Sequence, residues 1–171
     1  LVTFGDEQMT MTSARRYYER WRFLRKLGIP TASSMRVVDE EHVAMGDMTV
    51  DGSAFFGKVK QLAVRGEVKT GRRRELTPIE RVFLGVDPKT IKREIARVQE
   101  TAWQKGIRLA ADDEYDLLIR PDGSFGVLIM DITNLGKRRS EKYDLLLSER
   151  KVLERSIDWL REDLGKLAVT V

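Results

Sequence analysis

The chain has no cysteine and a single histidine among its 171 residues. Without cysteine there is no disulfide framework and no thiolate metal site, and one histidine leaves no basis for a zinc site of the usual kind. No apolar run approaches the roughly 20 residues that span a bilayer. The first residues also lack the basic start and apolar middle of a signal peptide. We therefore expect a soluble, cytoplasmic protein without a membrane segment.

Composition is that of a globular protein, but its charge is unevenly distributed. Hydrophobic residues make up 42% and charged residues 34%, and the net charge is only +4. A chain of this length can bury the core of one domain, so we expect a single domain over 1–171. Residues 58–74 carry seven basic side chains against one acidic, whereas 112–116 hold four acids in five positions.

Helices and short antiparallel strand pairs alternate in the predicted order. Apolar residues at steps of three and four, together with capping signals, predict helices over 14–27, from Thr77, from 88 to Gly106 and over 140–167. Short apolar runs separated by turn residues predict hairpins that join 35–38 to 42–45 and 117–119 to 125–132. A helix over 58–64 and a strand within 1–12 are weaker predictions. Local hairpins separated by helices indicate an α+β fold.

Three acidic residues lie around the second predicted hairpin. Asp131 stands near the end of its apolar second strand, and Asp113 and Asp116 stand where the chain enters its first strand. A hairpin brings these ends together, and Mg²⁺ prefers carboxylate oxygens. Such a cluster suits one base and one or two metal ligands in phosphoryl transfer. Alternatively, Asp131 caps the turn that follows it and 112–116 form a solvated turn.

The layout around these acids resembles the core of the protein-kinase-like C-lobe. The stretch 102–133 runs from a helix through Lys105-Gly106-Ile107, the acidic loop and an Asp-Gly turn to an apolar strand that ends near Asp131. In that family a catalytic Asp and Asn precede a metal-binding Asp. The resemblance implies that Asp113 is the catalytic acid and that Asp131 holds Mg²⁺, with Asp116 near the position of the Asn.

The first part of the chain resembles the corresponding part of the kinase-like N-lobe. The helix over 14–27 resembles the one that supplies a Glu to a lysine, which makes Glu19 the candidate. The segment Met45-Gly46-Asp47 resembles the hinge that contacts adenine. The implied architecture is therefore an N-lobe-like part over 1–50, a basic connector over 51–87 and a C-lobe-like part over 88–171.

The resemblance implies ATP and Mg²⁺ as cofactors and phosphoryl transfer if the domain is active. The sequence contains no Gly-rich phosphate loop, and no lysine precedes Glu19. These departures favour a reduced member of the family, one that binds a nucleotide or is an inactive pseudokinase.

Two further functions remain open from the sequence. The basic run is either a solvated connector or a phosphate-binding patch for nucleic acid, since each basic side chain displaces counterions. The residues of such a patch are Lys58, Lys60, Lys69, Arg72, Arg73 and Arg74. The third hypothesis is an interaction domain whose last helix, over 140–167, packs on a protein partner.

Overall fold

The structure is a computed structural model that describes residues 2–3, 13–108, 115–132, 136–137 and 143–169. Its helices are α1 (Ala14–Lys26), α2 (Lys58–Lys69), α3 (Pro78–Gly85), α4 (Pro88–Gln104) and α5 (Tyr143–Leu167). Its strands are β1 (Val2–Thr3), β2 (Met35–Val37), β3 (His42–Met45), β4 (Ala54–Phe56), β5 (Ile107–Arg108), β6 (Tyr115–Ile119), β7 (Phe125–Ile129) and β8 (Gly136–Lys137).

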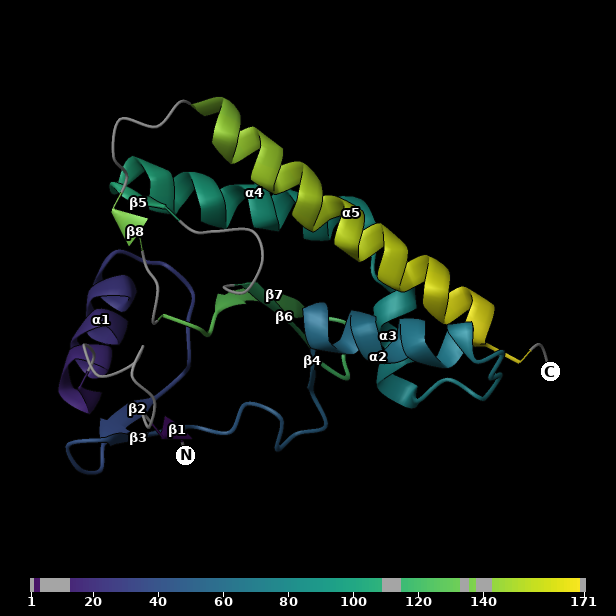
Figure 1. Cartoon of the computed structure of the whole chain (residues 1–171), viewed down its shortest axis with the longest axis horizontal. Coiled ribbons are helices and arrows are strands. Elements are labelled where there is room, and N and C mark those ends of the chain that lie inside the picture. The colour runs from purple at the N-terminus through teal and green to yellow at the C-terminus, as the bar shows by residue number, and fades with distance from the viewer. Residues whose placement is uncertain (1, 4–12, 109–114, 133–135, 138–142, 170–171) are drawn as a thin grey trace.

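The strands form small antiparallel sheets, which confirms the predicted α+β class. One sheet has the order β1-β3-β2, the second has the order β4-β6-β7, and β5 pairs with β8. Helices α4 and α5 run alongside each other above the second sheet, while α1 and the first sheet lie at the other end of the molecule (Figure 1). The kinase-like part of the prediction concerns the family and remains a resemblance.

Both predicted hairpins are confirmed. Strands β2 and β3 pair antiparallel, and β6 pairs with β7 with Leu117 opposite Val127. The turn between β6 and β7 follows from its sequence, because Asp122 accepts a hydrogen bond from the Ser124 amide and Gly123 adopts a φ of 84°, which glycine reaches without a steric penalty. Short-range turn chemistry therefore determines this hairpin.

The predicted helices are confirmed, and their caps follow from sequence. Helix α3 begins with a capping box between Thr77 and Glu80 with Pro78 in its first turn, and α4 begins at the Asp87 cap. Helix α2 is longer than predicted and reaches Lys69. The expected connector over 51–87 thus contains β4, α2 and α3.

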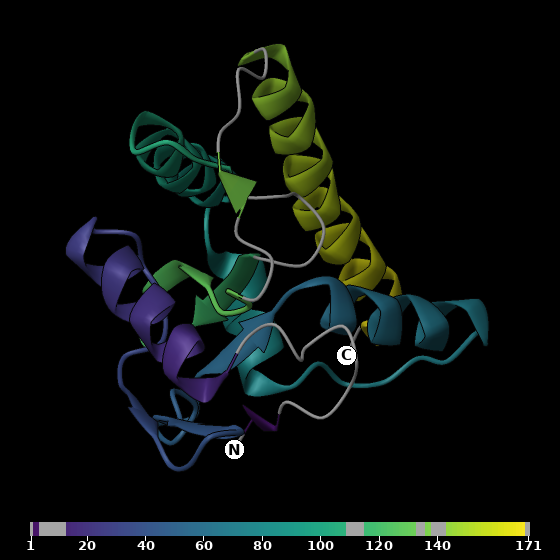
Figure 2. The ribbon, with the colours of Figure 1, turned by 60° about the vertical axis from the view of Figure 1, so that its left-hand side comes forward.

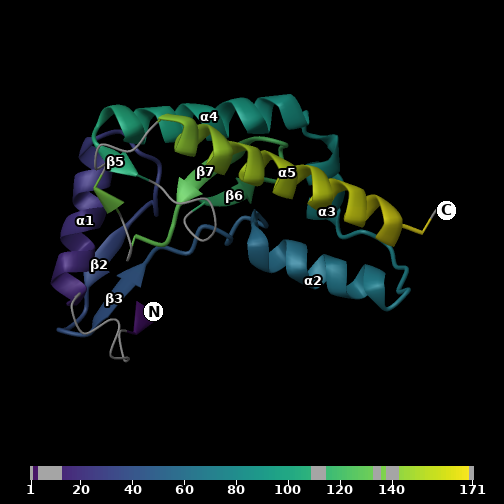
Figure 3. The same ribbon diagram turned by 45° about the horizontal axis from the view of Figure 1, so that its top comes forward.

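Strand β4 was not predicted, and it completes the central sheet. Ala54–Phe56 pairs antiparallel with β6, and Phe56 is buried against Phe83 of α3, with ring centroids 4.6 Å apart. Helix α2 follows directly and packs beside α5, which in turn lies along α4 (Figure 3). In the part of the chain that the structure describes, no helix has the length and apolar character of a membrane span.

Candidate functional site

Helix α1 is docked against the chain that leaves β7, and this contact positions Asp131. The Tyr17 hydroxyl donates to the Met130 carbonyl at 3.1 Å, and an Arg20 guanidinium nitrogen donates to the Ile132 carbonyl at 3.3 Å. Ile132 is fully buried, whereas Asp131, which lies between Met130 and Ile132 in the sequence, is exposed. Figure 2 shows α1 lying beside the β6–β7 strands. The helix therefore fixes the backbone on both sides of Asp131 while its carboxylate faces outward.

Asp131 lies close enough to Asp116 to affect the ionisation of the Asp116 carboxyl group. Asp116 is half-buried on β6, and burial raises its pKa, with the negative charge of Asp131 raising it further. Burial also raises the pKa of Tyr17, partly offset by a backbone hydrogen bond from the Ile132 segment, and Asp131 adds to the increase. The negative charge of Asp131, which follows β7, therefore acts on both Tyr17 of α1 and Asp116 of β6.

The N-terminus of α2 borders the same site. Gly57 is the N-cap of α2 and has extended backbone angles, and no side chain caps the helix there. A Cβ atom at Gly57 would lie 2.9 Å from Asp116 Oδ1, closer than real Cβ contacts allow. Lys58 follows in the first turn of the helix, where the peptide dipoles give a partial positive charge. A glycine at this position therefore lets the Asp116 carboxylate approach the positive end of α2.

Two neighbouring carboxylates beside a helix N-terminus are groups that could bind a cation. Two mutually repelling carboxylates are stabilised by a proton or a metal ion between them, and Mg²⁺ prefers such oxygens. Within the described ranges, no cluster of three or more His, Asp or Glu side chains is arranged to hold a metal. A Mg²⁺ ion held by Asp116 and Asp131 would thus need water or substrate phosphate as further ligands, as is usual for this ion. Asp113, the predicted catalytic acid, lies outside the described residues.

Glu19, which the resemblance implies as the partner of a lysine, lies on α1. Its carboxylate pairs with Arg15 at 3.6 Å on the exposed side of α1, with both side chains largely in solvent. The α1 residues that reach the Asp131 segment are Tyr17 and Arg20. Sequence reasoning assigned Tyr17 to the apolar stripe and gave Arg20 no role. Their three-residue spacing, which puts both on one helical face, was the available signal.

The predicted adenine-contacting residues belong to the first sheet and its loop, away from the cavities beside Asp116. Met45 ends β3. Asp47 accepts hydrogen bonds from the Thr49 hydroxyl at 2.7 Å and the Thr49 amide at 2.8 Å, which lower its pKa. Neither residue lines the two cavities bordered by Asp116. The Asp47 carboxylate therefore has a structural role in the local turn, where it binds Thr49.

Several residues of the proposed nucleic-acid patch are engaged within the fold. Arg74 forms two hydrogen bonds with the buried Glu80 carboxylate, and Lys60 pairs with the same carboxylate at 2.8 Å. Arg72 lies 3.6 Å from Glu67. The remaining predicted members are Lys58 at the start of α2 and Lys69 and Arg73, all exposed. Much of the positive charge of 58–74 is thus neutralised internally.

No family model, curated protein or solved structure matches this chain. The resemblance to the kinase-like fold therefore remains a prediction based on the residues quoted above.

Proposed function

We propose that this chain is a reduced kinase-like domain that binds a nucleotide together with Mg²⁺ at the site of Asp116 and Asp131. One observation carries the proposal: burial raises the pKa of the half-buried Asp116, and the nearby negative charge of Asp131 raises it further. Repulsion of this kind is relieved when a divalent cation binds.

The surroundings of the two acids support a phosphate-bearing ligand. The N-terminus of α2, with Lys58 in its first turn, supplies the positive potential that phosphates need. Carboxylates alone would repel a nucleotide, so the metal has to bridge the acids and the phosphates. This explains why we expect Mg²⁺ and nucleotide to bind together.

The same geometry favours binding over phosphoryl transfer. By the resemblance Asp113 would orient the acceptor, but Glu19, which would position a lysine, pairs with Arg15 instead. We therefore propose a pseudokinase that retains nucleotide binding. The internal pairing of Lys60 and Arg74 with Glu80 makes a nucleic-acid interface the weaker alternative, because paired cations release few counterions.

Thermal unfolding with ATP, with and without Mg²⁺, tests the proposal. A ligand at a hundredfold excess over its Kd stabilises by about 2.7 kcal/mol, which raises the Tm of a domain of this size by about 5–10 °C. We expect this increase only when ATP and Mg²⁺ are both present, and we expect Asp131→Asn to remove most of it.

A matched control removes a carboxylate elsewhere. Asp158 is exposed on α5 and pairs with Lys92 at 2.7 Å, so Asp158→Asn should keep the full nucleotide-dependent increase. The proposal would be wrong if millimolar ATP and Mg²⁺ left the wild-type Tm unchanged, or if Asp131→Asn responded like the wild type.

A further inference from the structure

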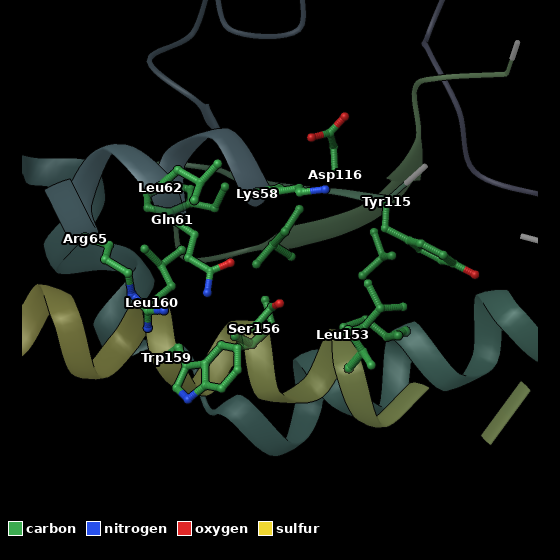
Figure 4. Close-up of a pocket in the computed structure, with 17 residues that line it drawn as sticks. Lys58, Gln61, Leu62, Arg65, Tyr115, Asp116, Leu153, Ser156, Trp159 and Leu160 are labelled. Atoms are coloured by element: carbon green, nitrogen blue, oxygen red, sulfur yellow. The ribbon is translucent and has the colours of Figure 1, made fainter. Parts of the chain in front are cut away.

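A second site lies on the other side of the β6–β7 strands, between α2 and α5. A partly open cavity of about 310 Å³ lies there, at the lower end of the range for small-molecule sites. Its wall is mostly apolar and comes from β4, α2, α4, β6, β7 and α5, with Ile95, Leu117, Val127, Leu153 and Leu160 among the apolar residues. Asp131 and Tyr17 do not line it, whereas Gly57, Lys58 and Asp116 do, although the Asp116 carboxylate points away from α5 (Figure 4). The cavity therefore adjoins the proposed nucleotide site and extends away from Asp131 towards α5.

Two neutral polar side chains face each other across this apolar space. Gln61 of α2 is only 9% exposed, and its amide points from α2 towards α5, where Ser156 lies (Figure 4). Among the residues that the structure describes, neither the Gln61 amide nor the Ser156 hydroxyl forms a hydrogen bond with another residue. The Gln61 amide is not among the fully buried side-chain groups that lack a partner in this part of the chain, so it carries no penalty for unpaired burial in its present position. The amide is therefore available to a molecule in the cavity.

One edge of the cavity is lined by Arg65 and Trp159, which contact each other. The Arg65 guanidinium lies over the Trp159 ring at 5.2 Å, and its Nε donates to Asp163 at 3.0 Å. Asp163 is buried and balances the charge of Arg65. A second guanidinium, that of Arg155, lies 5.8 Å from the centre of the Trp159 ring, so this edge is an aromatic ring held between basic side chains. The polar groups that point inward, Gln61 and Ser156, are uncharged.

We propose that this cavity binds a small, flat, mostly apolar molecule that carries one neutral hydrogen-bonding group such as a carboxamide. The apolar body packs on Leu117, Val127 and Leu153, and its polar group pairs with the Gln61 amide and the Ser156 hydroxyl. A carboxamide matches Gln61 because each amide both donates and accepts. The cavity shares Gly57, Lys58 and Asp116 with the nucleotide site, but the proposed polar contacts, to Gln61 and Ser156, involve neither Asp116 nor Asp131.

The test uses two probes of similar shape, 2-naphthamide and 2-isopropylnaphthalene, titrated by NMR while the indole N–H of Trp159 is followed. We expect the amide to bind about five- to tenfold more tightly, the scale of one neutral hydrogen bond. The Gln61→Leu variant should abolish this preference while both probes still bind, because leucine has no hydrogen-bonding group and fits the apolar wall of the cavity.

Two serines of α5 provide a matched pair for the location. Ser156→Trp fills the cavity and should abolish binding of both probes, while Ser148→Trp, on the exposed side of the helix, should leave binding unchanged. If Ser156→Trp does not fold, Leu62→Trp at the exposed rim replaces it, with the same expected loss. Asp131→Asn should leave 2-naphthamide binding unchanged while it abolishes the nucleotide response.

Three results would overturn this proposal. The first is an absence of probe binding in the wild type up to the solubility limit. The second is a preference for the amide that persists in Gln61→Leu. The third is tighter binding of the anionic 2-naphthoate than of 2-naphthamide, which would contradict the assignment to a neutral ligand.

Discussion

Glu80 should be the most costly single carboxylate to remove, because it is fully buried and joins three segments of the chain. It has no exposed surface and receives hydrogen bonds from two Arg74 nitrogens at 2.7 and 2.9 Å. Lys60 lies 2.8 Å away, and the Thr77 amide donates at 2.9 Å. Burial alone would raise the pKa of Glu80, but the hydrogen bonds from Arg74, Lys60 and Thr77 outweigh it and lower this pKa to about 2.

The lowered pKa converts into a pH-dependent stability. A decrease from 4.5 to about 2 corresponds to about 3 kcal/mol. The Arg74 and Lys60 side chains are 23% and 32% exposed, and solvent screening reduces this to roughly 2 kcal/mol. Because the folded-state pKa lies below the unfolded one, the stabilisation is complete above about pH 4.5 and is lost as the pH falls towards 2. Glu80→Gln also leaves two cations without their partner, so we expect a total loss of about 3 kcal/mol at pH 7.

Urea unfolding followed by circular dichroism measures this loss at pH 7 and at intervals down to pH 2. Glu94→Gln is the matched control, since Glu94 pairs with the exposed Arg97 and should cost less than about 1 kcal/mol. The wild type should lose stability relative to Glu80→Gln between about pH 4.5 and 2. A Glu80→Gln variant as stable as the wild type at pH 7, or with the same pH dependence, would refute the reasoning.

Three further changes have defined outcomes. Asp116→Asn should raise the free energy of unfolding at pH 7 in EDTA by on the order of 1 kcal/mol, because burial and Asp131 raise the pKa of Asp116. In urea titrations this gain should vanish below about pH 4, where the Asp116 carboxyl group is protonated in both the folded and the unfolded wild type. Gly57→Ala should cost at most about 1 kcal/mol, yet it should reduce the rise in Tm with ATP and Mg²⁺, because the new Cβ meets the Asp116 carboxylate. Arg161→Met should cost about 2–3 kcal/mol in urea unfolding, since Arg161 donates to three carbonyls at the end of α3; Arg161→Lys should recover less than half, because an ammonium lacks the planar fork.

The parts of the fold that the sequence predicts are those determined by local signals. The β6–β7 hairpin follows from its Asp122-Gly123 turn, and α3 follows from the Thr77–Glu80 capping box, both of which are confirmed. Strand β4 was missed because its partner β6 lies far along the chain. The short segment between Gly52 and Gly57 also shows no alternation of apolar and polar residues. Long-range pairing of this kind leaves no local trace.

For the candidate site, the sequence pointed to the proximity of Asp116 and Asp131 but not to the other residues that contact this segment. Asp131 and Asp116 could be placed together because a hairpin joins them. Tyr17 could not, because its apolar ring fits a core stripe and the hydroxyl partner, Met130, is 113 residues away. The role of Arg74 was also missed, since a run of arginines in a loop usually faces solvent, whereas here Arg74 holds a buried carboxylate.

The pKa of the Asp116 carboxyl group, measured by carbon-13 NMR, tests the central claim most directly. We expect a pKa above the ordinary aspartate range in the wild type, because of burial and Asp131, and a lower pKa in Asp131→Asn. We also expect Mg²⁺ with a nucleotide to lower the wild-type pKa. An Asp116 pKa that is the same in the wild type and in Asp131→Asn would show that the two carboxylates do not share a site, and would contradict the account.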